Sequence, residues 1–381
     1  QGLMLNAALG EDPMVRGDKG FTSFREKIAT FEGVKAAKTP KNFKGTLRNY
    51  QKEGLSWLEF VDEFEMGGIL ADDMGLGKTV QILAFLAGRP KKGKLPSIVV
   101  APKSLVFNWI DEASRFVPEM KVVAYAGAGR TKQFKELSKA DLVITTYGAV
   151  RTDIEKLQEI EFDVAIVDEA QAIKNAAARR SQAVFGLRAA FRLALSGTPV
   201  ENRLAELWSV MHAVNPGLLG TAQRFGERFV ALIERQHDRA AQRTLRRLIA
   251  PFVLRRTKAQ VLAALPPRTE LVLRVAAEPQ EAAHYEALRR DTLAQAERAL
   301  NGEAPGQAHL NILAGLTRLR RAACDPRLVT PSLSLVGAKV QAFGELAAEL
   351  VANGHKALVF SQFVDFLALL KAPLDAAGIA Y

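Results

Sequence analysis

The stretch GILADDMGLGKTVQ, residues 68–81, decides the fold of this chain. Its first four residues are apolar, as a buried strand requires, and a helical pattern follows over 79–87. Between them stand Gly75 and Gly77, which let backbone N–H groups converge on phosphate oxygens, while the start of the helix adds its positive dipole. The stretch therefore predicts a phosphate-binding loop between a strand and a helix.

Two side chains of this loop have chemical tasks of their own. Lys78 can reach the terminal phosphates of a nucleotide, and the hydroxyl of Thr79 can bind Mg²⁺. The strict pattern has Gly six residues before Lys78, where this chain has Asp72. The alternative interpretation is a glycine-rich turn that only joins a strand to a helix, but Lys and Thr stand where both groups are needed.

Short β-branched runs alternate with helical patterns over the first half of the chain. This alternation is typical of βαβ units and of a parallel sheet covered by helices on both faces, so the predicted fold class is α/β. Helices are expected from Leu47 to the turn at Gly67, and over 105–116. The predicted strands are Gly68–Ala71, Ile98–Ala101, Lys121–Tyr125, Leu142–Thr145, Val164–Val167 and Arg192–Leu195.

The pattern becomes mainly helical past Asn202, with one strand predicted at 269–275. A helix at 338–352 and a strand at 356–360 come last. One strand and two helices cannot close a sheet, so we expect the opening of a second lobe that is cut short. The predicted organisation is an N-terminal tail at 1–42, a first lobe at 43–203, a helical insertion and linker at 204–336, and the beginning of a second lobe at 337–381.

An acid pair, Asp168 and Glu169, directly follows the predicted strand 164–167. An aspartate at the carboxyl end of a parallel strand faces the phosphate loop, where it can hold Mg²⁺ through water. Glu169 can orient and deprotonate the attacking water. Alone, an apolar strand that ends in two acids is common, but together with the loop it predicts nucleotide hydrolysis.

Small hydroxyl residues end the next predicted strand, in Ser196-Gly197-Thr198-Pro199, and Asn202 follows. Hydroxyls at that edge of the sheet can hydrogen-bond the acid pair and also a bound nucleic-acid strand. The alternative is an ordinary Ser-Gly turn.

Composition excludes several classes of protein. The 381 residues, 48% of them hydrophobic and 24% charged, describe a globular chain of about two or three domains. The single cysteine, Cys324, forms no internal disulfide, and the five histidines lack metal-ligand spacing, which together favour a reducing cytoplasm. No apolar run is long enough to span a membrane.

The chain is basic, with 52 Lys and Arg against 41 Asp and Glu. Eight of these cations fall between Arg235 and Lys258 against one acid, and Arg318, Arg320 and Arg321 form a smaller cluster. Such stripes either follow a phosphate backbone or form a solvated helix face. No base-reading motif is present, so we expect backbone contacts with little sequence preference.

These motifs resemble the SWI/SNF-type branch of the superfamily 2 helicase-like ATPases, which are double-stranded DNA translocases. The similarity extends from residue 46 to the end, through LRNYQ at 47–51, ADDMGLGKTVQ at 71–81, APK at 101–103, TTY at 145–147, LRRTK at 254–258 and LPP at 265–267. Asp72 is itself usual for this branch. The resemblance implies a RecA-like fold, with LRRTK as the link into the helical insertion and Ser361 with Gln362 as the opening motif of a second lobe.

The resemblance also implies roles for individual residues. Lys78, Asp168 and Glu169 would be catalytic, Thr79 and Asp168 would hold Mg²⁺, and Gln171, Ser196 and Thr198 would couple the sites. The nucleotide contacts would be Gln51, on adenine, with Asp73, Met74, Gly75, Leu76, Gly77, Lys78 and Thr79. The DNA contacts would be Lys103, Thr145, Thr146, Tyr147, Ser196, Thr198, Asn202, Ser361 and Gln362.

This chain departs from the family pattern in two ways. Ala170 and Gln171 stand where Gly-His is usual, and the arginines that the second lobe places on the γ-phosphate do not occur in these residues. Because such arginines contribute roughly 10³ to 10⁵ in turnover, we expect ATP binding with feeble hydrolysis.

The expected function is ATP- and Mg²⁺-dependent translocation on double-stranded DNA, with DNA-bound proteins as targets and a nucleoid location in a bacterium. The alternatives are a strand-separating helicase, an RNA-dependent ATPase, or an ATP-gated clamp on DNA or protein.

Overall fold

The computed structural model describes residues 36–89, 95–197, 203–261, 271–302 and 305–381, with the side chains of 300–305 excepted. The chain divides into two compact units, 1–266 and 267–381. The boundary falls inside the segment that the sequence assigns to the insertion and linker. Each unit is considered by itself.

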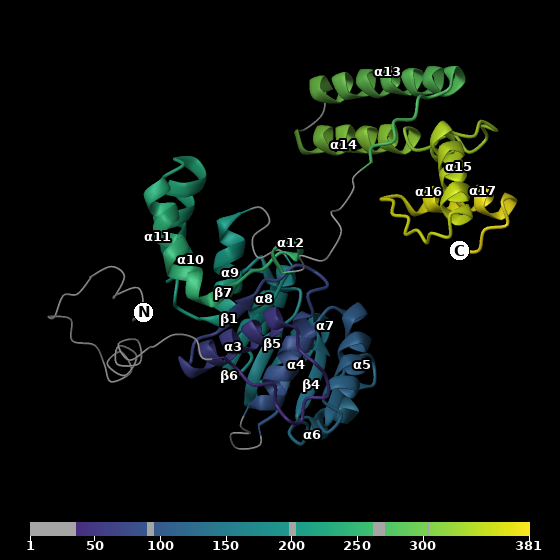
Figure 1. Ribbon diagram of the computed structural model, residues 1–381. Coiled ribbons are helices and arrows are strands. Elements are labelled where there is room, and N and C mark those ends of the chain that lie inside the picture. Colours follow the sequence, from purple (N-terminus) through teal and green to yellow (C-terminus); the bar gives the residue numbers. More distant parts are fainter. Residues whose placement is uncertain (1–35, 90–94, 198–202, 262–270, 303–304) are drawn as a thin grey trace. The chain divides into compact units, whose positions relative to one another are not determined.

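The first unit is built on a parallel sheet in the strand order β3-β4-β2-β5-β6-β1-β7 (Figure 1). The strands are β1 (Gly68–Leu70), β2 (Ser97–Ala101), β3 (Val122–Tyr125), β4 (Leu142–Thr146), β5 (Phe162–Val167), β6 (Ala189–Leu195) and β7 (Val253–Leu254). All pairings are parallel. The α/β prediction and its six strands are confirmed. Strand β7 was not predicted, because a strand of two residues is too short to show an alternating apolar pattern.

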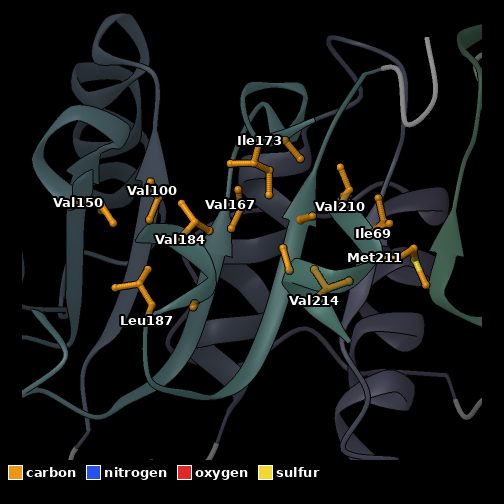
Figure 2. Close-up of a cluster of buried hydrophobic side chains, with 14 of the residues drawn as sticks. Ile69, Val100, Val150, Val167, Ile173, Val184, Leu187, Val210, Met211 and Val214 are labelled. Atoms are coloured by element: carbon orange, nitrogen blue, oxygen red, sulfur yellow. The ribbon is translucent and has the colours of Figure 1, made fainter. Parts of the chain in front are cut away.

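Alternating residues of the central strands enter two separate cores. In β2, Val99 packs with one set of helices and Val100 with another. One face carries α3 (Asn49–Glu63), α4 (Lys78–Gly88) and α5 (Val106–Phe116). The other carries α7 (Tyr147–Leu157), α8 (Arg179–Phe185) and α9 (Leu204–Val214). Figure 2 shows Val150 and Val184 near Val100 and Val167, and Val210 and Met211 near Ile69. The predicted helical cover on both faces is confirmed.

The remaining elements of the first unit are short and lie in its loops and beyond α9. The 3₁₀ helices are η1 (Lys103–Leu105), η2 (Arg130–Gln133), η3 (Ala170–Ile173) and η5 (Ala250–Phe252). The helices are α6 (Phe134–Leu137), α10 (Ala222–Phe225), the π-helix η4 (Gly226–Arg235), α11 (Arg239–Ile249) and α12 (Lys258–Val261).

The regular elements in the described part of the second unit are all helices. Helices α13 (Pro279–Gly302) and α14 (Pro305–Ala322) pack together, and η6 (Pro326–Leu328), α15 (Ala338–Ala352), α16 (Val364–Leu369) and α17 (Lys371–Ala376) follow. The prediction for α15 is confirmed at both ends. Gly354, with φ of 72°, lies just after its C-terminal end.

Two strand predictions in the second unit are wrong. Residues 271–275, the described part of one prediction, and 356–360 are irregular. Leu358 and Phe360 are each 86% exposed, because no neighbouring strand is present among the described residues there to pair with this segment.

Within the described ranges, none of the helices is both long and apolar enough to cross a bilayer.

Candidate active site

The loop between β1 and α4 has the geometry of a phosphate cradle. Gly75 and Gly77 adopt φ of 84° and 75°, a region that favours glycine, and Gly77 caps α4. A Cβ at Gly77 would lie 2.6 Å from Nε2 of Gln51. Lys78 Nζ donates to the Asp72 carbonyl oxygen at 2.7 Å, so its ammonium lies along the loop, with Thr79 next to it in the first turn of α4.

Gln51 and its neighbour Tyr50 hold the loop from helix α3. Gln51 Nε2 and the Tyr50 hydroxyl both donate to the Leu76 carbonyl oxygen, at 3.2 Å each. Gln51 Oε1 accepts from the backbone N–H of Arg48 at 2.9 Å, which fixes the amide at the start of α3. The predicted adenine contact therefore lies directly beside the phosphate loop.

Asp72, which stands where the strict pattern has glycine, is a fully buried ion-pair partner of Arg256. Arg256 donates to it from Nε at 2.9 Å and from Nη2 at 2.5 Å. The same guanidinium bonds Gln81 Oε1 at 2.8 Å and the Tyr50 carbonyl oxygen. One arginine thus joins the phosphate loop to helices α3 and α4.

The segment after β7 also touches the loop through backbone and side chain. Asp73 N–H donates to the Arg256 carbonyl oxygen at 3.0 Å, and Lys258 N–H donates to Asp73 Oδ2 at 3.0 Å. The Lys258 ammonium lies 3.5 Å from the position that a Cβ on Gly75 would take. By sequence, Arg256 and Lys258 belong to the LRRTK link and to the basic stripe at 235–258. Their contact with the phosphate loop could not be foreseen, because no local pattern indicates that Arg256 pairs with Asp72, 184 residues away.

Met74 and Leu76 complete the predicted nucleotide contacts, with opposite exposures. Met74 is 64% exposed beside Gly197, whereas Leu76 is fully buried. Leu76 serves the loop through its backbone carbonyl.

The acid pair lies at the end of β5, one strand removed from the phosphate loop. The buried Asp168 accepts from Trp109 Nε1 at 2.8 Å and from the Glu169 N–H at 2.8 Å. Burial raises the pKa of Asp168, against the opposing influence of these two hydrogen bonds and of the Lys78 ammonium. Lys78 and Asp168, predicted from stretches about 90 residues apart, are therefore within electrostatic reach of each other.

Glu169 is linked to the next strand by a chain of side-chain contacts. Gln171 Nε2 donates to Glu169 Oε2 at 2.6 Å, and the Ser196 hydroxyl donates to Gln171 Oε1 at 3.3 Å. Glu169 itself has φ of 49°, which turns the backbone sharply after β5. The amide of Gln171 is suited to this position because it donates with one end and accepts with the other.

Thr145 and Tyr147, which we predict to contact DNA, are both buried in the first unit. The Thr145 hydroxyl is fully buried and donates to the Tyr125 carbonyl oxygen at 2.8 Å. The Tyr147 hydroxyl donates to the Asp168 carbonyl oxygen at 2.5 Å, beneath the acid pair. Both hydroxyls therefore donate hydrogen bonds within the first unit.

The other predicted DNA contacts differ in their surroundings. Lys103 is exposed, while Thr146 is half-buried and caps α7 by accepting from the Ala149 N–H at 3.1 Å. In the second unit, Ser361 is half-buried and the exposed Gln362 accepts a hydrogen bond from Arg320. Thr198 and Asn202 lie outside the described residues.

The two basic clusters have different environments. In the first, Arg239, Arg243, Arg246 and Arg247 are exposed on α11, whose Leu245 and Leu248 are buried. Arg256 does not belong to this surface. In the smaller cluster, Arg318 pairs with Asp291 at 3.5 Å and Arg321 with Asp365 at 2.9 Å, so part of its charge is used within the unit.

The donor set fits magnesium shared with a nucleotide. Among the described residues no group of three or more His, Cys, Asp or Glu could enclose a metal ion. Mg²⁺ commonly takes one or two carboxylates and completes its shell with phosphates and water. A fixed carboxylate, Asp168, within electrostatic reach of Lys78, matches that requirement, and Thr79 follows Lys78 in the chain.

Comparison with known proteins agrees with this geometry. The chain matches the SNF2-related domain over residues 50–328. It is 36% identical over 369 residues to Bacillus subtilis YwqA, which carries the name of an ATP-dependent helicase/translocase; the match covers 94% of this chain and 40% of YwqA. The TATA-binding protein-associated factor mot1 of Schizosaccharomyces pombe is 39% identical over 271 residues, covering 64% of this chain and 14% of mot1.

The solved structures include a similar ATPase core. The Sulfolobus solfataricus SWI2/SNF2 ATPase core in complex with double-stranded DNA is 32% identical, with a TM-score of 0.59, over 90% of this chain and 72% of that one. The chain thus spans less than half the length of the two curated relatives described above.

Proposed function

The chain belongs to the SWI2/SNF2 family, and from that premise we propose that it is the ATP-binding part of a motor that moves along double-stranded DNA and displaces proteins bound to it. The names of two relatives describe ATP-dependent helicases, which supports ATP as the nucleotide. In this proposal, ATP hydrolysis at Asp168 and Glu169 drives movement along the duplex.

The contact chain from Glu169 through Gln171 to Ser196 is the observation that carries this proposal. Glu169 accepts a proton from the attacking water, which changes its charge and the strength of its hydrogen bond from Gln171. Ser196 directly follows β6, and this strand lies between the strands that carry the acid pair and the phosphate loop. A change at the hydrolytic carboxylate would thus be passed to Ser196, which is one of the residues that we predict to contact DNA.

The phosphate loop supplies binding and orientation. Its backbone amides and the Lys78 ammonium hold the phosphates, while Asp168 and Thr79 would hold Mg²⁺. When bound, Mg²⁺ would neutralise charge on the β- and γ-phosphate oxygens. The amide of Gln51, which lies beside the loop, would contact the base.

Double-stranded DNA is the proposed track for two reasons. The exposed arginines of α11 offer a row of cations without base-reading groups, which suits a phosphate backbone. A family member of similar sequence is known in complex with double-stranded DNA. The name of mot1, a TATA-binding protein-associated factor, supports DNA-bound proteins as the targets.

The Glu169→Gln variant tests this proposal. We expect it to bind MgATP like the wild type and to lose DNA-stimulated hydrolysis, which we propose is weak in residues 1–381 alone. Measuring nucleotide affinity and turnover, with and without duplex DNA, separates the two effects. Vigorous turnover in the isolated wild-type chain would contradict the expected weakness, and undiminished turnover in Glu169→Gln would contradict the assigned role.

The nucleic-acid substrate needs a separate comparison. DNA duplex, single-stranded DNA and RNA are offered to the wild-type chain, and the duplex is expected to bind most tightly. Preferential stimulation by RNA, or separation of the strands, would replace the translocase with an RNA-dependent ATPase or a helicase.

A further inference from the structure

The indole of Trp109 binds the carboxylate at the centre of the site. Trp109 is 1% exposed on helix α5, and its Nε1 donates to Asp168 Oδ2 at 2.8 Å. We propose that Trp109 is a positioning residue for Mg²⁺ binding, which holds the Asp168 carboxylate in the orientation that the metal requires. This inference rests on the proposed ATPase function.

Both oxygens of Asp168 have a protein donor of their own. Oδ1 accepts from the Glu169 N–H and Oδ2 from Trp109, each at 2.8 Å, so rotation of the carboxylate about its Cβ–Cγ bond would break a bond on each side. Each oxygen keeps a further lone pair for a metal ion or its water shell. Second partners of this kind orient metal ligands and tune their affinity.

The donor itself is held rigidly. Trp109 and Ala113 are the buried residues of α5, and both pack in the core between this helix and the sheet. Asp168 follows β5, a buried strand of the same sheet. The distance between the indole and the carboxylate is therefore set by the packing of a helix on a sheet, which varies little.

The other two tryptophans provide an internal comparison. Trp57 Nε1 donates to the Pro251 carbonyl oxygen at 3.0 Å, and Trp208 Nε1 donates to the Gly220 carbonyl oxygen at 3.1 Å. Both are 9% exposed, so all three indoles are buried and hydrogen-bonded. Trp109 alone among them donates to a carboxylate, which a purely space-filling role would not require.

The test replaces each tryptophan with phenylalanine, which keeps an aromatic ring and removes the N–H. Binding of a non-hydrolysable ATP analogue is titrated by calorimetry with Mg²⁺ and with EDTA. For Trp109→Phe we expect the gain in affinity due to Mg²⁺ to fall about 10- to 100-fold, with binding in EDTA unchanged within about twofold. Trp57→Phe and Trp208→Phe should keep the wild-type gain.

A measurement on the wild-type chain keeps the inference testable if Trp109→Phe fails to fold. Nitrogen-15 labelling of tryptophan gives three indole signals, which Trp57→Phe and Trp208→Phe assign by elimination. Adding Mg²⁺ to the protein with bound analogue should shift the Trp109 signal and leave the other two in place. An unmoved Trp109 signal, or a Mg²⁺-dependent gain in Trp109→Phe equal to the controls, overturns the inference. Failure of the wild-type chain to bind the analogue at all would instead refute the proposed function.

Discussion

Asp72→Ala removes the counter-charge of a buried arginine and should strongly destabilise the first unit. Asp72 is fully buried, and Arg256 is 8% exposed and would keep its charge. Removing one partner of a buried pair typically costs about 3–5 kcal/mol. At about 2–4 °C per kcal/mol for a unit of this size, the melting temperature should fall by about 6–20 °C.

Intrinsic fluorescence is the appropriate assay, because the three tryptophans at 57, 109 and 208 all lie in the first unit. Its thermal transition therefore reports this unit and not the helical one. Glu161→Ala is the matched control, since Glu161 forms an ion pair with Arg188 in which both side chains are more than half exposed. Such surface pairs contribute about 0–1 kcal/mol, so this variant should melt within a few degrees of the wild type.

A double-mutant cycle then assigns the loss to the pair. Arg256→Met alone should also destabilise, and the Asp72→Ala/Arg256→Met double variant should be more stable than the sum of the single losses predicts, with coupling of about 0.5–3 kcal/mol. If Asp72→Ala melts like Glu161→Ala, or if the two single losses are additive, Asp72 and Arg256 do not brace the loop and the reasoning is refuted.

Two further predictions concern a half-buried acid and the basic helix. Burial, with Asp111 and Asp168 nearby, raises the pKa of Glu112, whose Oε2 is buried without a hydrogen-bond partner among the described residues. Glu112→Gln should therefore stabilise the first unit at pH 7–8. This gain in stability should shrink as the pH falls through the raised pKa, because the wild-type carboxylate then takes up a proton. Urea denaturation at several pH values measures the gain, and a gain that grows in acid would contradict the prediction. Replacing Arg239, Arg243 and Arg246 of α11 with Gln should weaken duplex binding. The slope of log affinity against log salt concentration should become shallower by about 0.9 for each phosphate that the variant no longer neutralises. Replacing Lys132, Lys135 and Lys139 with Gln removes the same charge elsewhere and should leave this slope unchanged.

Local patterns explain how much of the fold is predictable from the sequence. The strands and helices of the first unit each carry their own periodicity, and parallel strands bring their carboxyl ends to one edge, which predicts the meeting of Lys78 and Asp168. The departure at Asp72 had no local explanation, because its partner, Arg256, follows a strand of two residues at the far end of the unit.

The individual roles of the site residues are less predictable because they depend on burial. Thr145 and Tyr147 follow the family motif in sequence, yet both hydroxyls are used inside the unit. No local pattern indicates a partner for Trp109, and only the structure shows its indole on Asp168. The pattern at 356–360 has strand composition, but composition cannot supply a neighbouring strand.

Binding of MgATP to the loop around Gly77 is the central claim. Calorimetric titration of the wild-type chain with a non-hydrolysable ATP analogue and Mg²⁺ tests it most directly, with Lys78→Ala as the comparison. We expect saturable binding of one nucleotide per chain, weakened at least about tenfold by the loss of the Lys78 ammonium, since charged hydrogen bonds contribute about 1.5–3 kcal/mol. No binding to the wild type, or equal affinity in both proteins, would contradict it.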